Sequence, residues 1–232
     1  MATNAQLGAD DDYIVVRNPS KLADLLTARN VDPEVVTKYL HIIRGDAKDC
    51  YTVGKTLYGI NLEIADMVVS DVGGSTVVKP NRLRPTLDDP TICQDVVSNI
   101  PNSLKRIELL FKATPRTRRK PYIVVISTTG ISNHGRDIAV AMDKKAMEGI
   151  LLREIQTGGR GASVIRGFTA VRPSFLTDGK PVGAQKIRAA VEEEGKVAKS
   201  AIGYTISRGD VGAWIYEELV EDNAAGELKY VN

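Results

Sequence analysis

Basic and polar side chains follow the first apolar run of the chain. Arg17 and Asn18 come directly after Tyr13–Val16, and Lys21 lies close by. At the end of the second strand of a dinucleotide-binding fold, an acidic residue binds a ribose 2′-hydroxyl, whereas arginine suits a 2′-phosphate through a charge-assisted pair. A turn into a helix with solvated charges would use the same residue types. The sequence therefore leaves both a phosphate site and a plain turn open.

Two further strand ends carry residues that suit a dinucleotide. Asp46 follows the apolar run Leu40–Arg44, and its carboxylate would accept a hydrogen bond from the exocyclic amine of adenine. Gly73 and Gly74 follow Ala65–Ser70, and their missing side chains would let the backbone approach a ribose or a pyrophosphate. A simple turn Asp and a plain glycine loop look the same in sequence. Both positions are candidates on residue type alone.

Hydroxyl and amino groups supply the candidates for catalysis. The apolar run Tyr122–Ser127 ends in Ser127 and continues into Thr128, which places two hydroxyls where substrate and nicotinamide would meet. The predicted helix Asp143–Glu154 carries a pair of lysines, and Lys145 is our candidate for contact with the nicotinamide ribose. Polar residues often end a buried strand for structural reasons alone, and a helical lysine is solvated by default.

These candidates need a scaffold that brings strand ends together. Apolar β-branched runs alternate with helical stretches along the chain, which favours right-handed βαβ crossovers and ligands beyond the carboxyl ends of the strands. The sequence therefore predicts an α/β fold, with a Rossmann-type, doubly wound, mostly parallel sheet in a single domain. We expect strands at Tyr13–Val16, Leu40–Arg44, Ala65–Ser70, Tyr122–Ser127 and Gly167–Val171, and helices at Pro19–Ala28, Pro33–Tyr39, Thr52–Tyr58, Thr91–Phe111, Asp143–Glu154 and Ser207–Leu219.

Several local features refine this prediction. Ser20 is the expected N-cap of the first helix. Residues 75–90 contain three prolines and no clear periodicity, which predicts a surface loop. Pro101 is expected to kink or divide the helix that contains it. Ser207 and Asp210 form a start motif for the last helix. Residues 1–12 are expected to be disordered, and residues 167–232 are expected to line the substrate side.

Composition excludes several classes of protein. Hydrophobic residues make up 43% of the chain and charged residues 26%, with a net charge of +2, so neither a nucleic-acid partner nor an anionic membrane is expected. The basic cluster within 116–120 is interpreted as a solvated loop. Cys50 and Cys93 form no CxxC pair, so neither a disulfide framework nor a metal site is predicted. No apolar stretch has the length of a membrane span, and the N-terminus lacks a signal-peptide pattern, which favours the cytoplasm.

Seven short motifs together carry a family resemblance. In order they are VVRNPSK, GD, VVSDVGG, VVISTTG, KKAME, VRPSFLTDG and YTISRGDVG. The chain resembles the NmrA-like group of atypical short-chain dehydrogenases/reductases, in its fungal NAD(P)H-binding form. The resemblance implies a Rossmann-type sheet and a preference for NADP(H), with NAD(H) as the alternative. It also implies cofactor contacts at Arg17, Asp46 and Gly73, with Pro173, Ser174 and Phe175 near the nicotinamide.

The chain departs from that family in two places. The family begins with a strand and a G-x-x-G-x-x-G loop that binds the pyrophosphate, but only sixteen residues precede Arg17 here and Gly8 is their sole glycine. We therefore expect a sheet truncated at its N-terminal side. The predicted helix Asp143–Glu154 also lacks the Tyr-x-x-x-Lys motif of ordinary short-chain dehydrogenases, because Val140 and Ala141 stand four residues before its two lysines.

Three hypotheses follow for function. The first is an NAD(P)H-dependent oxidoreductase that acts on a small organic or flavin-like acceptor, with the cofactor supplying the chemistry. The second is a non-catalytic NADP(H)-binding regulatory or sensor protein, which the missing Tyr-x-x-x-Lys favours. The third is a truncated remnant that has lost cofactor binding, which the missing loop favours. The strand-end residues fit a substrate pocket and place the oxidoreductase first.

Overall fold

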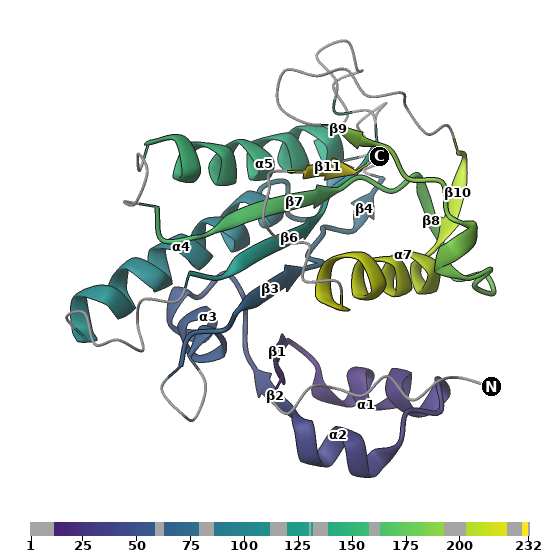
Figure 1. Ribbon diagram of the computed structural model, residues 1–232, viewed down its shortest axis with the longest axis horizontal. Coiled ribbons are helices and arrows are strands. Elements are labelled where there is room, and N and C mark those ends of the chain that lie inside the picture. The colour runs from purple at the N-terminus through teal and green to yellow at the C-terminus, as the bar shows by residue number, and fades with distance from the viewer. Residues whose placement is uncertain are drawn as a thin grey trace. The chain divides into compact units, whose positions relative to one another are not determined.

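The computed structural model describes residues 12–58, 63–78, 86–111, 120–129, 131, 139–157, 163–192, 203–221 and 229–231 (Figure 1). The segment 1–11, most of the basic cluster at 116–120 and Gly130 lie outside these residues. The chain divides into two compact units. Unit 1 comprises residues 1–65 and 99–119, and unit 2 comprises residues 66–98 and 120–232.

Unit 1 is built on two parallel strands and short helices. Its strands pair in register from Asp12 opposite Leu40 to Val16 opposite Arg44. Each strand is a run of apolar, mostly β-branched residues, and each helix follows a turn, so all five predicted elements of this segment are confirmed. They are β1 (Asp12–Val16), α1 (Pro19–Ala28), α2 (Pro33–Tyr39), β2 (Leu40–Arg44) and α3 (Cys50–Leu57).

The helix caps of unit 1 correct one prediction. Asn18, and not Ser20, is the N-cap of α1, since its side chain accepts a hydrogen bond from the Lys21 N–H at 3.2 Å. Pro19 then occupies the first helical position, where its missing N–H and fixed φ are tolerated. This arrangement leaves Ser20 inside the helix. Asp49 caps α3 in the same way by accepting hydrogen bonds from Tyr51 and Thr52.

Unit 2 contains a five-stranded sheet in the order β3-β6-β7-β11-β9. The first four strands are parallel, and β9 pairs antiparallel with β11. The sheet is therefore mostly parallel, as the sequence predicts. All residues of β6 and β7 are buried, which explains their continuous apolar sequences. The strands are β3 (Met67–Ser70), β6 (Tyr122–Ile126), β7 (Gly167–Val171), β9 (Val191–Glu192) and β11 (Lys229–Val231).

Two predictions about the connections need correction. Residues 75–90 do not form a plain loop, because β4 (Thr76–Val77) and β5 (Thr86–Leu87) pair antiparallel within that segment. Pro101 does not divide its helix, because α4 (Ile92–Phe111) is one continuous helix across it, while the alternative of a kink stays a prediction. The helix tolerates the proline at the cost of one backbone hydrogen bond.

The remaining elements of unit 2 frame the sheet and a smaller parallel pair of strands. Helix α5 (Ala139–Thr157) connects β6 to β7 and is longer than predicted. Ser207 caps α7 (Arg208–Ile215) by accepting a hydrogen bond from the Asp210 N–H, which confirms the predicted start motif. The last helix continues as a π-helical segment over Tyr216–Glu221. Strands β8 (Phe175–Thr177) and β10 (Thr205–Ser207) pair in parallel beside α7 (Figure 1).

Helix α7 covers one face of the sheet. Tyr122, Val124 and Ile126 alternate along β6 and form one buried cluster with Val211 and Ile215 of α7. Side chains of a strand alternate between faces, so the intervening residues of β6 point to the other side, where they are also fully buried. The sheet is therefore covered on both faces. No helix among the described residues is long and apolar enough to cross a membrane.

We predict that Gly167→Ala destabilises unit 2. A Cβ at position 167 would lie 2.9 Å from Cε2 of Tyr122, whose buried ring is held by a 2.8 Å hydrogen bond between its hydroxyl and Thr169. Overpacking of this kind costs about 1–3 kcal/mol of the free energy of unfolding. Urea titration followed by the fluorescence of Trp214, the sole tryptophan, measures this loss within unit 2.

Gly212→Ala is the matched control. A Cβ at this exposed helical position meets no atom within 4 Å, and alanine is the better helix former by about 1 kcal/mol. The control should therefore unfold at the same urea concentration as the wild type or a higher one. Equal stability of Gly167→Ala and the wild type would contradict the tight packing of Tyr122.

Candidate active site

The carboxyl ends of β6 and β7 bring four predicted residues to one edge of the sheet. The Ser127 N–H donates to the Val171 carbonyl at 2.7 Å, and the Thr129 N–H donates to the Pro173 carbonyl at 3.3 Å. These bonds continue the β6–β7 pairing beyond the strands. Ser127 and Thr128 from the first strand end therefore lie beside Pro173 and Ser174 from the second, because parallel neighbouring strands end at the same edge.

The Ser127 hydroxyl is a buried polar group without a partner among the described residues. The residue is 4% exposed, and its Oγ makes no hydrogen bond with any of them. Burying a hydroxyl without a hydrogen bond is unfavourable, so such groups call for an explanation such as a ligand. The Thr128 hydroxyl differs, since it is half-buried and donates to the Thr129 carbonyl at 3.3 Å.

Helix α5 presents three buried charged side chains to the rest of unit 2. Asp143, Lys144 and Glu148 are each less than 9% exposed. They recur at helical spacing with the buried apolar residues Met147 and Leu151, so charged and apolar side chains share one face of the helix. Each of the three charges has a partner from another element.

Lys144 links the segment after β3 to the end of β6. Its ammonium donates to the Val72 carbonyl beyond β3 at 3.0 Å and to the Ile126 carbonyl at the end of β6 at 2.5 Å. An ammonium group has three N–H donors, so these two bonds leave one. Lys145, our catalytic candidate from the sequence, is exposed on the neighbouring face of the helix.

Asp143 binds the start of helix α4. Its carboxylate accepts hydrogen bonds from the Cys93 and Gln94 N–H groups at 2.9 and 3.1 Å. These groups belong to the first turn of the helix, whose N–H donors have no partner within the helix and whose dipole favours a negative charge. The Cys93 thiol lies beside this contact and donates to the Val72 carbonyl at 3.2 Å. Burial raises the pKa of Cys93 to about 12, so the thiol stays protonated at neutral pH.

Glu148 fixes the first residue after β7. The guanidinium of Arg172 pairs with the Glu148 carboxylate through two hydrogen bonds, Nη2 to Oε2 at 2.6 Å and Nε to Oε1 at 3.1 Å. Such a bidentate pair sets both the distance and the orientation of the two groups. The chain therefore leaves β7 in a defined direction before it reaches Pro173 and Ser174.

The segment after β3 contains an acidic residue and the two predicted glycines. Desolvation raises the pKa of Asp71, against the opposing attraction of Lys144 and Arg208. A Cβ at Gly73 would meet nothing within 4 Å, so the backbone there is open to approach. A Cβ at Gly74 would lie 3.0 Å from the Asp89 carbonyl oxygen, so packing within the chain already favours glycine at that position.

A cavity of about 370 Å³ opens beside this edge of the sheet. Thr129, Pro173 and Ser174 line it, together with residues of β8, β10, α7 and the segment after β8. Ser127, Thr128 and Lys145 are not among the lining residues, and Phe175 is 74% exposed outside the lining. The structure therefore brings Pro173 and Ser174 into the cavity and places Ser127 behind its wall, since its backbone binds Val171, which lines the cavity.

The predicted cofactor residues of unit 1 lie at the ends of its two strands. Arg17 and Lys21 are exposed, while the Asn18 side chain serves as the cap of α1. Asp46 accepts a hydrogen bond from the Lys48 N–H at 2.9 Å, as a turn Asp does. The roles assigned to these residues in cofactor binding stay predictions.

Sequence analysis missed two residues that this geometry makes important. Lys144 is the buried lysine of the pair, and its spacing to Met147 and Leu151 would have indicated that face of the helix. Asp210 was assigned only to a helix start, but its carboxylate also binds the segment after β8. No local pattern in the sequence indicates that second contact.

Two fungal proteins are similar to the chain in sequence. No protein-family model matches it. It is 38% identical over 231 residues to the reductase pytE of Aspergillus terreus, an alignment that covers 92% of this chain and 83% of the reductase. It is 25% identical over 240 residues to the oxidase pynE of Aspergillus niger, with 89% and 83% covered.

Solved structures share the fold. A short-chain dehydrogenase from Bacillus anthracis superposes with a TM-score of 0.56 at 15% identity, over 95% of this chain and 83% of that one. A serine dehydrogenase from Escherichia coli superposes with a TM-score of 0.50 at 13% identity, over 73% and 72%. The fold is thus the Rossmann-like α/β fold of short-chain dehydrogenases. The chain belongs to the same family as the A. terreus reductase, and it shares its fold with short-chain dehydrogenases.

We predict that Lys144→Met destabilises unit 2 more than Lys145→Met does. The first substitution leaves the buried carbonyls of Val72 and Ile126 without their donor, which lowers the free energy of unfolding by about 1–3 kcal/mol. The second changes an exposed neighbour on the same helix and serves as the matched control. Urea unfolding of both variants measures the difference, and equal stabilities would show that Lys144 does not hold the strand ends.

Proposed function

We propose that this chain is an NADP(H)-dependent reductase of the NmrA-like group that acts on a small organic or flavin-like acceptor. The observation that carries the proposal is the cavity at the carboxyl edge of the sheet, which is lined by Thr129, Pro173 and Ser174. The Ser127 hydroxyl, which has no partner among the described residues, belongs to the neighbouring strand end. Ligands of open α/β sheets bind at this edge. The relationship to a fungal reductase supports the same function.

The residues of unit 2 fit a nicotinamide and a substrate. When bound, NADPH supplies the hydride. Ser127 and Thr128 would orient the acceptor through their hydroxyls, and the buried Ser127 Oγ, which has no partner among the described residues, is suited to bind such a group. Pro173, Ser174 and Phe175 would position the nicotinamide ring. Catalysis would then rest on holding donor and acceptor together.

Further contacts are assigned to the rest of the cofactor. The exposed Lys145 would bind the nicotinamide ribose, and the open backbone at Gly73 and Gly74 would approach a ribose or the pyrophosphate. In unit 1, Arg17 and Lys21 would bind a 2′-phosphate beside Asn18, while Asp46 would accept from the adenine amine. These assignments favour NADP(H) over NAD(H), since a guanidinium pairs with a phosphate through two parallel hydrogen bonds.

A second function is favoured by one observation. Position 140, four residues before Lys144, is valine, and the ammonium of Lys144 is bound to two backbone carbonyls. The tyrosine–lysine pair that transfers protons in ordinary short-chain dehydrogenases is therefore missing at Lys144 of α5. A regulatory NADP(H)-binding protein without turnover fits this arrangement. NADPH oxidation tested against quinone, flavin and aldehyde acceptors separates the two functions, since binding of NADPH without oxidation favours regulation.

We predict that Ser127→Ala lowers turnover without lowering stability. Removal of a buried hydroxyl that has no partner within the described chain costs no hydrogen bond there, so the free energy of unfolding stays equal or rises. Loss of a group that orients the acceptor lowers kcat by about tenfold or more. Ser98→Ala is the control, because its hydroxyl bonds to Asp95 within α4 and its loss should leave kcat unchanged. Full activity of Ser127→Ala would show that the Ser127 hydroxyl does not orient the acceptor.

We predict that Arg17→Ala weakens binding of NADPH selectively. Loss of a charge-assisted pair with the 2′-phosphate should raise the Kd for NADPH by about tenfold or more, while the Kd for NADH stays the same. Arg29→Ala, at the exposed C-cap of α1, removes the same charge as a control. Calorimetric titration of the wild type and the two variants gives a Kd for each dinucleotide, and equal losses for NADPH and NADH in Arg17→Ala would refute the phosphate assignment.

A further inference from the structure

The cavity of unit 2 has an apolar wall and a basic wall. Val171, Ile206, Val211 and Trp214 form the apolar side. Three basic side chains, Lys180, Lys186 and Arg188, line the side made by the segment after β8. At about 370 Å³ the cavity lies at the lower end of the range of roughly 300–1,000 Å³ for small-molecule sites. It is therefore shaped for a small ligand with one apolar and one polar end.

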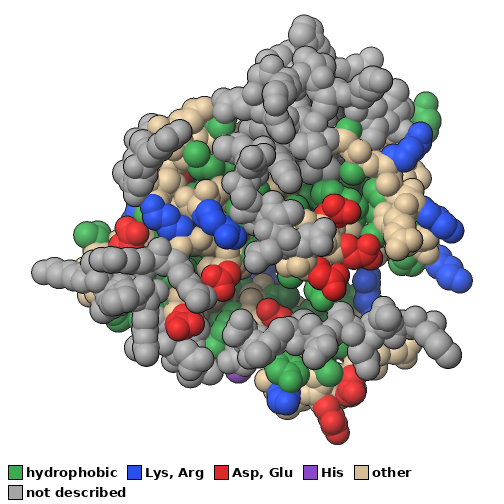
Figure 2. All heavy atoms as spheres, viewed as in Figure 1, with side chains coloured by type: hydrophobic (Ala, Val, Ile, Leu, Met, Phe, Trp, Pro, Cys, Tyr) green, Lys and Arg blue, Asp and Glu red, His purple; other side chains and the backbone are tan. Residues whose placement is uncertain are grey.

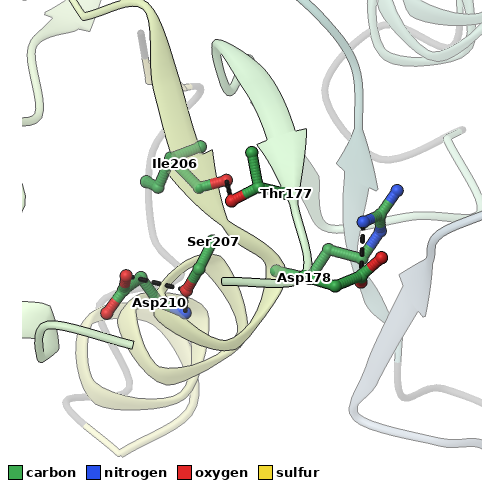
Figure 3. A network of polar contacts seen from close by, with 6 residues as sticks. Thr177, Asp178, Ile206, Ser207 and Asp210 are labelled. Carbon is green, nitrogen blue, oxygen red and sulfur yellow. Dashed lines mark hydrogen bonds and ion pairs between the residues drawn. The ribbon is translucent and has the colours of Figure 1, made fainter. Parts of the chain in front are cut away.

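Asp210 is the only carboxylate among the described residues that line the cavity, and its acceptor positions are occupied. It is 3% exposed. Its Oδ1 accepts hydrogen bonds from the Val182 and Gly183 N–H groups, both at 2.8 Å, and its Oδ2 accepts from the Ser207 hydroxyl at 2.7 Å (Figure 3). Burial alone would raise the pKa of Asp210, but these hydrogen bonds lower it, so the group stays ionised. Both of its carboxylate oxygens are thus hydrogen-bonded to the chain.

The hydrogen bonds of Asp210 also fix the basic wall. Gly183 has a φ of 102°, a conformation that favours glycine, and its N–H is held by Asp210. A 3₁₀ turn over Ala184–Lys186 follows, with Ala184 buried. The segment is therefore anchored at its centre, and the basic side chains on either side of the anchor extend from a defined backbone.

Lys180 and Lys186 have few acidic neighbours along their own segment. Asp178 is the sole acidic residue between positions 178 and 190, and it pairs with Arg208 at 2.8 Å (Figure 3). In the space-filling view, Lys and Arg side chains gather along the side of the molecule formed by β8 and β10, and acidic side chains lie further toward the middle (Figure 2). A cavity lined by cations with low-dielectric walls attracts anions.

We propose that this cavity binds substrates that carry a carboxylate, which Lys180 and Lys186 hold while the apolar body of the substrate packs against Trp214. Calling the bound carboxylate a substrate rests on the proposed reductase function. The binding itself follows from the two walls of the cavity and can be measured without turnover. A carboxylate is favoured over a neutral acceptor because Lys180 and Lys186 line the pocket, while the one carboxylate of its described lining, Asp210, is hydrogen-bonded to the chain.

The test uses Trp214, the sole tryptophan of the chain, as the reporter. Its fluorescence is titrated with 4-formylbenzoate and with the methyl ester of the same compound, without cofactor, and N-acetyltryptophanamide is titrated in parallel to correct for absorption. We expect saturable quenching by the carboxylate with a Kd about tenfold below that of the ester, as two charge-assisted contacts imply. In the double variant Lys180→Ala/Lys186→Ala the two Kd values should become equal, through loss of the carboxylate affinity alone.

Lys38→Ala/Lys55→Ala is the matched control, since it removes two exposed lysines of unit 1 and gives the same net charge. It should keep the tenfold preference. Equal affinities of the wild type for acid and ester would overturn the proposal. So would a loss of NADPH affinity in Lys180→Ala/Lys186→Ala with no change for 4-formylbenzoate, because the lysines would then serve the cofactor phosphates. Carboxylate binding in a protein that never oxidises NADPH would instead refute the reductase function and leave the cavity assignment intact.

Discussion

The buried charged face of α5 determines how the carboxyl edge of the sheet is built. Asp143 binds the start of α4, Lys144 joins the segment after β3 to the end of β6, and Glu148 orients Arg172 after β7. Charged side chains are rarely buried, because desolvation is costly unless partners compensate it. Here each charge has such partners, and those partners are the backbone and side-chain groups that frame the site. One helix therefore sets the positions of three strand ends.

Much of the scaffold was predictable because its strands are local. The strands β1, β2, β6 and β7 can be recognised in the sequence from β-branched runs of four or five residues. The helices between them imply a parallel sheet. The pairs β4–β5 and β8–β10 were missed for the opposite reason. Strands of two or three residues have no measurable periodicity, and their pairing depends on residues up to thirty positions apart. The N-cap of α1 was predicted at Ser20 and lies at Asn18, because both residues can cap a helix. Pro19 favours the first helical position, and this places the cap at Asn18.

The candidate site was predictable in its location and less so in its chemistry. That Ser127 and Pro173 meet follows from parallel strands alone. Which of two adjacent lysines is buried depends on the phase of α5 against the sheet, and so Lys144 closes the strand ends while Lys145 faces outward. The role of Asp210 depends on a segment almost thirty residues earlier in the chain. Contacts of this kind join residues that are far apart in the sequence, so residue spacing does not predict them.

We propose that the carboxyl edge held by α5 binds the nicotinamide dinucleotide. Hydrogen exchange followed by mass spectrometry, with and without saturating NADPH, tests it most directly, because bound ligand slows exchange of the amides that it covers or rigidifies. We expect slower exchange in peptides that contain residues 127–129 and 172–175. Unchanged exchange in those peptides, under conditions where NADPH raises the melting temperature, would show that the dinucleotide binds elsewhere.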